Sequence, residues 1–157
     1  MTLYHGTSSN FSTIDFSHSK DKRDFGKGFY TTTIYEQASQ WAKNQFVRYG
    51  GEGSFVKVFE YVPDSDLSIL DFSSMNLEWL EFVKINRTKG GLTHGYDIVK
   101  GPVANDNTMR TIALYISGIY TAEQAMEKLS FFKVNDQISF HTERALKNLR
   151  WREDVKI

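Results

Sequence analysis

Hydrophobic and polar positions divide the chain into short strand-like stretches and longer helical ones. Five stretches are short and rich in β-branched or aromatic residues, which is typical of strands. They are "TLYHG" (2–6), "GFYTT" (28–32), "SFVKVFEYV" (54–62), "YDIVKG" (96–101) and "QISFH" (137–141). We expect each of them to form one strand.

Apolar residues recur at helical spacing over residues 35–49, so we expect an amphipathic helix that the glycines of "GGEG" (50–53) end. The recurring residues are Ala38, Trp41, Ala42, Phe46 and Tyr49. Four more helices are expected at "MNLEWLEFVKI" (75–85), "DNTMRTIALYISG" (106–118), "TAEQAMEKLSF" (121–131) and "TERALKNLRW" (142–151). The segment 121–131 opens with Thr and has Gln three residues later, which is a capping-box pattern.

Strands and helices do not alternate regularly, which argues against a doubly wound parallel sheet. We therefore expect an α+β fold with mostly antiparallel strands. The 157 residues, 40% of them hydrophobic, suffice for one domain with a real core and are too few for two. The prediction is a single domain over residues 1–157.

Charge and residue usage narrow the chemistry. Nineteen basic and nineteen acidic side chains give a formal net charge of zero. The net charge therefore gives no reason to expect nucleic acid or an anionic membrane as a binding partner. The chain has no Cys, and its four His show no metal-site spacing, so no metal is expected. With no signal-peptide pattern and no long apolar run, we expect no membrane partner and a cytoplasmic location.

Two stretches place polar, small and aromatic groups where strands usually bury Val or Ile. They are "LYHGTSSNF" (3–11) and "DFGKGFYTTT" (24–33). The second is not a phosphate-binding loop, because it lacks the upstream glycine at the required distance. A third unusual stretch, "NDQISFHTERAL" (135–146), follows late in the chain.

In this order, the three stretches resemble the ADP-ribosyltransferases of the diphtheria-toxin and poly-ADP-ribose-polymerase type, the His-Tyr-Glu class. The matching pieces are His5-Gly6-Thr7, Gly26-Lys27-Gly28-Phe29-Tyr30 and the late strand near Gln137. The whole chain resembles an uncharacterised bacterial family of small domains assigned to this superfamily. The resemblance implies two small antiparallel sheets that flank an NAD cleft, with peripheral helices.

The resemblance also implies roles for individual residues. His5 would hydrogen-bond the adenosine ribose, Gly6 would offer its backbone to the nicotinamide carboxamide, and Thr7 completes this NAD-binding motif. Tyr30 and Trp41 would sandwich the nicotinamide ring. Ordinary structural roles stay open: His5 as a hydrogen-bonded strand-end residue, Tyr30 as a strand aromatic, and Trp41 as part of the apolar stripe of its helix.

The third position departs from the family pattern, since chain-building members carry Glu there. Alternation along a strand puts Ile138 and Phe140 on one face and Gln137 on the other with the polar residues. We therefore prefer Gln137 as the third catalytic residue beside His5 and Tyr30, with Asp136 as the rival and Glu143 as a distant third. An amide orients a ribose hydroxyl but takes no proton, so single transfer is expected instead of chain elongation. Gln137→Glu should leave hydrolysis intact or raise it.

The functional expectation is an NAD-dependent mono-ADP-ribosyltransferase with NAD as substrate and an unidentified acceptor, which could be protein, nucleic acid or a small molecule. A role as a bacterial toxin with a cognate antitoxin follows by analogy only. The alternatives are an NAD glycohydrolase and a catalytically degenerate module that binds NAD or ADP-ribose. The basic stretch "SKDKRDFGK" (19–27) either closes over the NAD phosphates or is a solvated loop.

Overall fold

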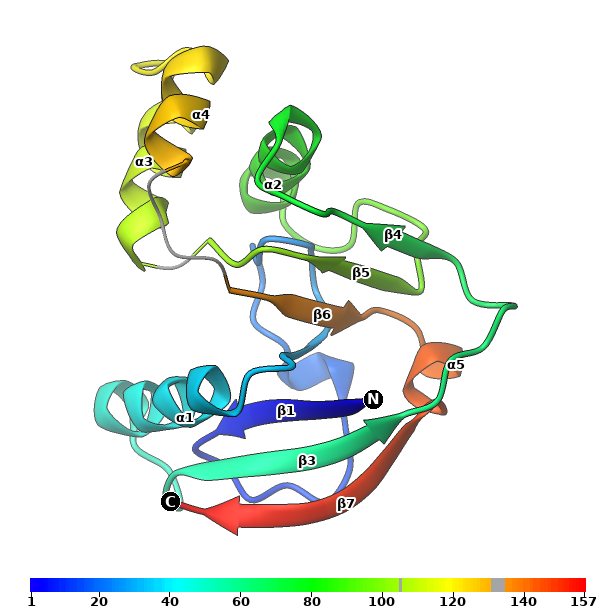
Figure 1. Ribbon diagram of the computed structural model, residues 1–157. Helices are drawn as coiled ribbons and strands as arrows, with labels where there is room; N and C mark the ends of the chain where they lie inside the picture. Colours follow the sequence, from blue (N-terminus) through cyan, green and yellow to red (C-terminus); the bar gives the residue numbers. More distant parts are fainter. Residues whose placement is uncertain (105, 131–134) are drawn as a thin grey trace.

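Two small sheets form the centre of the computed structural model, which describes residues 1–104, 106–130 and 135–157 (Figure 1). The first sheet is antiparallel, in the order β1 (Thr2–Thr7), β3 (Phe55–Tyr61), β7 (Leu149–Lys156). The second has the order β2 (Phe29–Thr31), β6 (Gln137–Phe140), β5 (Ile98–Gly101), β4 (Ile69–Asp71). Its β4–β5 pair is parallel and its other pairs are antiparallel. The fold is therefore a mixed α+β fold, as expected.

Helices surround the two sheets (Figure 1). Their bounds are η1 (Phe16–His18), α1 (Tyr35–Tyr49), α2 (Leu77–Lys89), α3 (Asp106–Ile116), α4 (Ala122–Leu129) and α5 (Glu143–Leu146). Helix α1 packs on the three-stranded sheet, whereas α2, α3 and α4 lie beside the four-stranded sheet. The Thr121 capping box opens α4, as its sequence predicted.

An apolar layer joins the two sheets. Leu3 and Phe59 from the first sheet meet Phe29, Ile138 and Phe140 from the second in one buried cluster. Burial of such side chains stabilises the folded chain by about 2 kcal/mol each. The two sheets therefore share a core. A cavity between them has walls from both sheets.

A single bridge brings the start of the chain to the end of β2. Tyr4 and Thr32 exchange two backbone hydrogen bonds, with N···O distances of 2.8 and 2.9 Å. This bridge places β1 directly beside the β2–α1 connection. It thereby brings two of the unusual sequence stretches together.

The sequence predicted five strands and the bounds of α1 correctly, but it missed β4 and β7. The segment 142–151 was wrongly predicted as one helix. Its helix ends at Leu146, and β7 begins at Leu149 and pairs with β3. The pairing with β3 is a long-range contact, and it overrides the local helical spacing.

The apolar stripe predicted for α1 is only partly buried. Ala38 and Ala42 face β1 and are almost completely buried, but Trp41, Phe46 and Tyr49 are 40%, 41% and 67% exposed. Small residues at the contact let the helix approach the sheet closely. The three aromatic residues lie at the edge of the contact between α1 and the sheet, and Trp41 also lines the candidate site.

Candidate functional site

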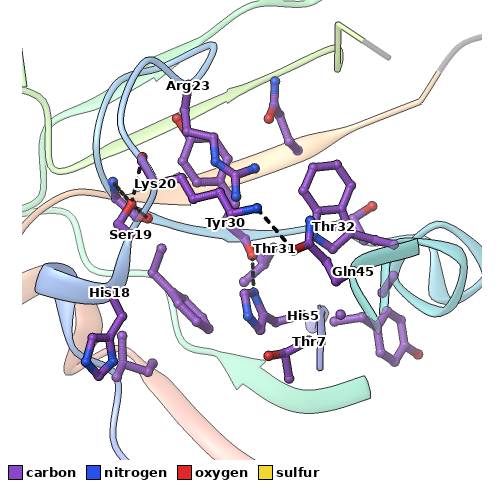
Figure 2. A pocket seen from close by; sticks show the side chains of 18 of the residues that line it. His5, Thr7, His18, Ser19, Lys20, Arg23, Tyr30, Thr31, Thr32 and Gln45 are labelled. Atoms are coloured by element: carbon purple, nitrogen blue, oxygen red, sulfur yellow. Dashed lines mark hydrogen bonds between the residues drawn. The ribbon is translucent and has the colours of Figure 1, made fainter. Parts of the chain in front are cut away.

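A cavity of about 430 Å³ lies where the two sheets and α1 meet. The segment of residues 8–28 forms another wall (Figure 2), and Arg87, Val103 and Ala104 complete the lining. Every preferred candidate from the sequence lines it: His5, Gly6, Thr7, Tyr30, Trp41 and Gln137. A volume of this size is in the range of small-molecule and cofactor pockets.

His5 is held as a neutral ring at the base of the cavity. Its Nδ1 lies 2.6 Å from the carbonyl oxygen of Tyr30, and the ring stacks on Phe29 with centroids 4.3 Å apart (Figure 2). Burial lowers the pKa of His5 from 6.5 to about 4, so the ring is neutral at pH 7. Because Nδ1 donates to a carbonyl, Nε2 is the acceptor nitrogen, and no described residue donates to it.

Gly6 directs its backbone N–H and C=O to the edge of β1 that β3 does not cover. Tyr61 N donates to Met1 O (2.8 Å) on the β3 side, whereas Tyr4 bonds with Thr32 on the opposite side. Because backbone groups alternate between the two edges of a strand, the N–H and C=O of Gly6 point to the same edge as those of Tyr4. It lies past the bridge to Thr32, where the described residues give its backbone no partner and the cavity begins.

Gly6 is also required by the packing of α1. A Cβ atom at this position would lie 2.0 Å from the carbonyl oxygen of Ala38. Any side chain would therefore push α1 away from β1. Close helix packing alone explains this glycine, and its open backbone edge is a separate property.

Tyr30 and Trp41 both contribute rings to the cavity, but Arg23 already contacts them. The Arg23 guanidinium carbon lies 5.4 Å from the Tyr30 centroid and 5.1 Å from the Trp41 centroid. The Tyr30 hydroxyl accepts from Phe25 N and donates to Gly26 O, and burial raises the pKa of this hydroxyl above its usual value. The expected sandwich of a ligand between the two rings thus requires the guanidinium to move.

Part of the basic stretch 19–27 reaches over the mouth of the cavity. Lys20 donates to Gln45 Oε1 (3.2 Å) and lies 3.9 Å from the ring centroid of Tyr49, both on α1. With Arg23, it ties the segment 8–28 to α1. Lys22 and Lys27 do not line the cavity. The stretch is therefore divided between cavity residues and surface residues.

Thr7 contributes to the cavity wall through a local turn. Its hydroxyl accepts from Ser9 N (3.1 Å) and lies 3.3 Å from Ser9 O. These contacts turn the chain at the end of β1. Thr7 therefore shapes the wall at the point where the segment 8–28 begins.

The three alternatives for the third position lie in different surroundings. Gln137 lines the cavity and is 7% exposed. The Asp136 carboxylate instead binds the hydroxyls of Thr32 and Thr33 and the Thr33 backbone N–H, so it fixes the β2–α1 connection. Glu143 is exposed at the start of α5 and lines a second groove. Of the three alternatives, only Gln137 lines the cavity.

Asp24 and Arg87 also line the cavity and were not singled out from the sequence. Asp24 is 4% exposed and forms an ion pair with Arg87, which lies on α2. The two residues are 63 positions apart, so no local spacing connects them. Asp24 lies two residues before the glycine motif that begins at Gly26, and this proximity is the one signal that the sequence offers.

The described residues are all except 105 and 131–134. Within them, no group of three or more His, Cys, Asp or Glu side chains lies close enough to hold a metal ion. No helix in the same residues has the length and apolar character needed to cross a membrane.

Comparison with known proteins places the chain in a family. No curated protein and no solved structure matched it. One family matches residues 1–151, which include every residue of the cavity. The chain therefore belongs to the family described as "Protein of unknown function (DUF3990)".

Proposed function

We propose that this protein is a mono-ADP-ribosyltransferase that cleaves the nicotinamide–ribose bond of NAD and transfers ADP-ribose to an acceptor. One observation carries the proposal. The residues that resemble the signature of His-Tyr-Glu ADP-ribosyltransferases, with Gln in place of Glu, come from β1, β2, α1 and β6 and line one cavity. Residues far apart in the chain thus meet in the way that a shared ligand would require.

Gly6 and Tyr30 suit the nicotinamide end of NAD. A carboxamide has one acceptor oxygen and an NH₂ donor, which match the N–H and C=O that Gly6 presents at the open edge of β1. The nicotinamide ring of NAD is cationic, and a cation is attracted to an aromatic face such as that of Tyr30. Arg23 lies over this face, so its guanidinium leaves when the ring binds.

His5 and Gln137 suit the ribose groups. The Nε2 atom of His5 is an acceptor for a ribose hydroxyl, and the side-chain oxygen of Gln137 is a second acceptor. When the nicotinamide–ribose bond breaks, its electron pair goes to the ring nitrogen and neutralises nicotinamide. The acceptor nucleophile then bonds to the ribose carbon and releases its proton to solvent or to a base of its own, because a Gln amide takes up no proton.

Without a Glu at position 137, we expect one ADP-ribose per acceptor site and no chain. Analogy with ADP-ribosyltransferase toxins adds a cytoplasmic toxin with a cognate antitoxin to the proposal. The same residues suit an NAD glycohydrolase, in which water takes the place of the acceptor. Gln137 itself favours a second candidate, a module that binds NAD or ADP-ribose without turnover.

Nicotinamide release from NAD separates these candidates. The purified protein is incubated with NAD, with and without cell lysate, and binding is measured in parallel by calorimetry. Release that requires lysate supports transfer, and equal release without lysate supports hydrolysis. Binding without release supports the module, and absence of both refutes the proposed site. Mass spectrometry of lysate labelled with tagged NAD then identifies the acceptor.

A further inference from the structure

Asp24 is a buried carboxylate whose hydrogen bonds come from three parts of the chain: α2, the segment after β5, and β6. Its Oδ1 accepts from Arg87 Nε (2.8 Å) and from Arg87 Nη2. Its Oδ2 accepts from Ala104 N (2.9 Å) and from Gln137 Nε2 (2.9 Å). Both oxygens are thus occupied, so Asp24 acts on a ligand only through its partners.

The amide of Gln137 has one orientation that satisfies its neighbours. Its Nε2 donates to Asp24 Oδ2 (2.9 Å) and to Pro102 O (3.0 Å). Both neighbours are acceptors, so the reversed amide would place oxygen against two oxygens and lose both hydrogen bonds. The two N–H groups are therefore used, and the side-chain oxygen Oε1 points elsewhere.

Oε1 is the atom of Gln137 that remains for a ligand. No described residue donates a hydrogen bond to it, and Gln137 lines the cavity. An amide oxygen held in this way accepts a hydrogen bond from a hydroxyl of the ligand. It offers the acceptor function of a carboxylate oxygen without a negative charge.

A carboxylate at position 137 is incompatible with this arrangement. Glu in place of Gln137 would bring a second anion beside Asp24 and would point an oxygen at the carbonyl of Pro102. Two neighbouring carboxylates cannot both ionise at low cost, and a buried acceptor without a donor costs about 1–3 kcal/mol. The expectation that Gln137→Glu preserves or raises activity therefore fails unless Asp24 also changes.

We propose that Asp24 is a positioning residue of this site: it requires Gln at position 137 and directs Oε1 of that amide to a ribose hydroxyl of the substrate. The inference rests on the proposed function for the identity of the substrate. It rests on the hydrogen bonds of Asp24 and Gln137 for the positioning itself.

A double-mutant cycle tests the inference. Gln137→Glu should lower kcat for nicotinamide release at pH 8 by about thirtyfold and change the KM for NAD by no more than about threefold. Asp24→Asn combined with Gln137→Glu restores a donor beside the new carboxylate, and kcat should recover by about tenfold. Gln40→Glu is the matched control, because Gln40 is exposed on α1 outside the cavity.

The pH profile of Gln137→Glu distinguishes positioning from a general loss of structure. Its kcat relative to that of the wild type should rise as the pH falls from 8 toward 5.5, because the carboxylate pair then gains a shared proton. A flat ratio, or a double variant no better than Gln137→Glu, overturns the inference. Wild-type kcat in Gln137→Glu at pH 8 also overturns it.

Melting temperatures without NAD separate this inference from the proposed function. At pH 8, Gln137→Glu should melt lower than the wild type, and Asp24→Asn should restore part of the loss. If the wild-type protein neither binds nor cleaves NAD, the proposed function and the substrate role of Oε1 both fail, while this cycle still measures the Asp24–Gln137 contact. Purely additive melting shifts refute the contact itself.

A wild-type measurement covers the case in which Gln137→Glu does not fold. The side-chain amide protons of Gln137 are followed by NMR in the wild-type protein and in Asp24→Asn. We expect slow exchange with solvent in the wild type and faster exchange in the variant. Equal exchange in both proteins overturns the inference.

Discussion

Two histidines, His5 in the cavity wall and the buried His141, should make this protein lose stability in mild acid. Burial lowers the pKa of His5 and of His141 from 6.5 to about 4. Between these pH values, the unfolded chain binds protons that the folded chain excludes, so stability is complete above pH 6.5 and falls as the pH decreases. The expected loss for each ring is about 2 kcal/mol at pH 5 and about 3 kcal/mol at pH 4.

Urea unfolding at pH 7.5, 6 and 5 measures this loss. His141→Asn should remove about half of the decrease in unfolding free energy between pH 7.5 and 5, whatever its effect at pH 7.5. His18→Asn is the matched control, since His18 is an exposed residue, and it should keep the wild-type decrease. A wild-type unfolding free energy that is equal at pH 7.5 and pH 5 would refute the burial of neutral rings.

Substitutions at three positions test the packing and the ring contacts around the cavity. Gly6→Ala should cost about 3 kcal/mol or more in thermal unfolding, because its Cβ would meet Ala38 O at 2.0 Å; an unchanged Tm contradicts that close packing. Trp41 is 40% exposed, so Trp41→Ala should raise the Kd for NAD about fivefold with little change in Tm, and Trp41→Phe should bind normally; a large Tm loss with normal binding would make Trp41 a core residue. Arg23→Ala should bind free nicotinamide about fivefold more tightly by calorimetry, since the guanidinium no longer competes for the Tyr30 face, and weaker binding contradicts this.

Most of the secondary structure could be predicted because local patterns and the fold agree. Residues 35–49 show apolar side chains at helical spacing, and residues 54–62 are rich in the β-branched and aromatic residues typical of strands. The glycines of 50–53 separate the two segments. The end of the chain could not be predicted in the same way, because β7 depends on pairing with β3, almost a hundred positions earlier. The segment 69–71 is too short to show any period, and it is a strand through its parallel pairing with β5.

Residues of the candidate site could be predicted where they belong to one short sequence motif. His5, Gly6 and Tyr30 stand out as polar, small or aromatic residues in short strands, and strand alternation distinguished Gln137 from Asp136. Partners from distant elements were not predictable. Asp24 and Arg87 meet only through the fold, and nothing in the sequence indicated that Arg23, within the basic stretch 19–27, lies over the rings of Tyr30 and Trp41.

The most direct test of the central claim is a calorimetric titration of NAD into the wild-type protein and into His5→Ala at pH 7.5, where the His5 ring is neutral. The proposed transferase and the alternative glycohydrolase both require NAD in this cavity with a ribose hydroxyl on His5 Nε2. We expect the wild-type protein to bind NAD, and His5→Ala to bind it about tenfold more weakly with its fold intact by circular dichroism. No binding by the wild type, or equal binding by both proteins, would contradict the proposed NAD site.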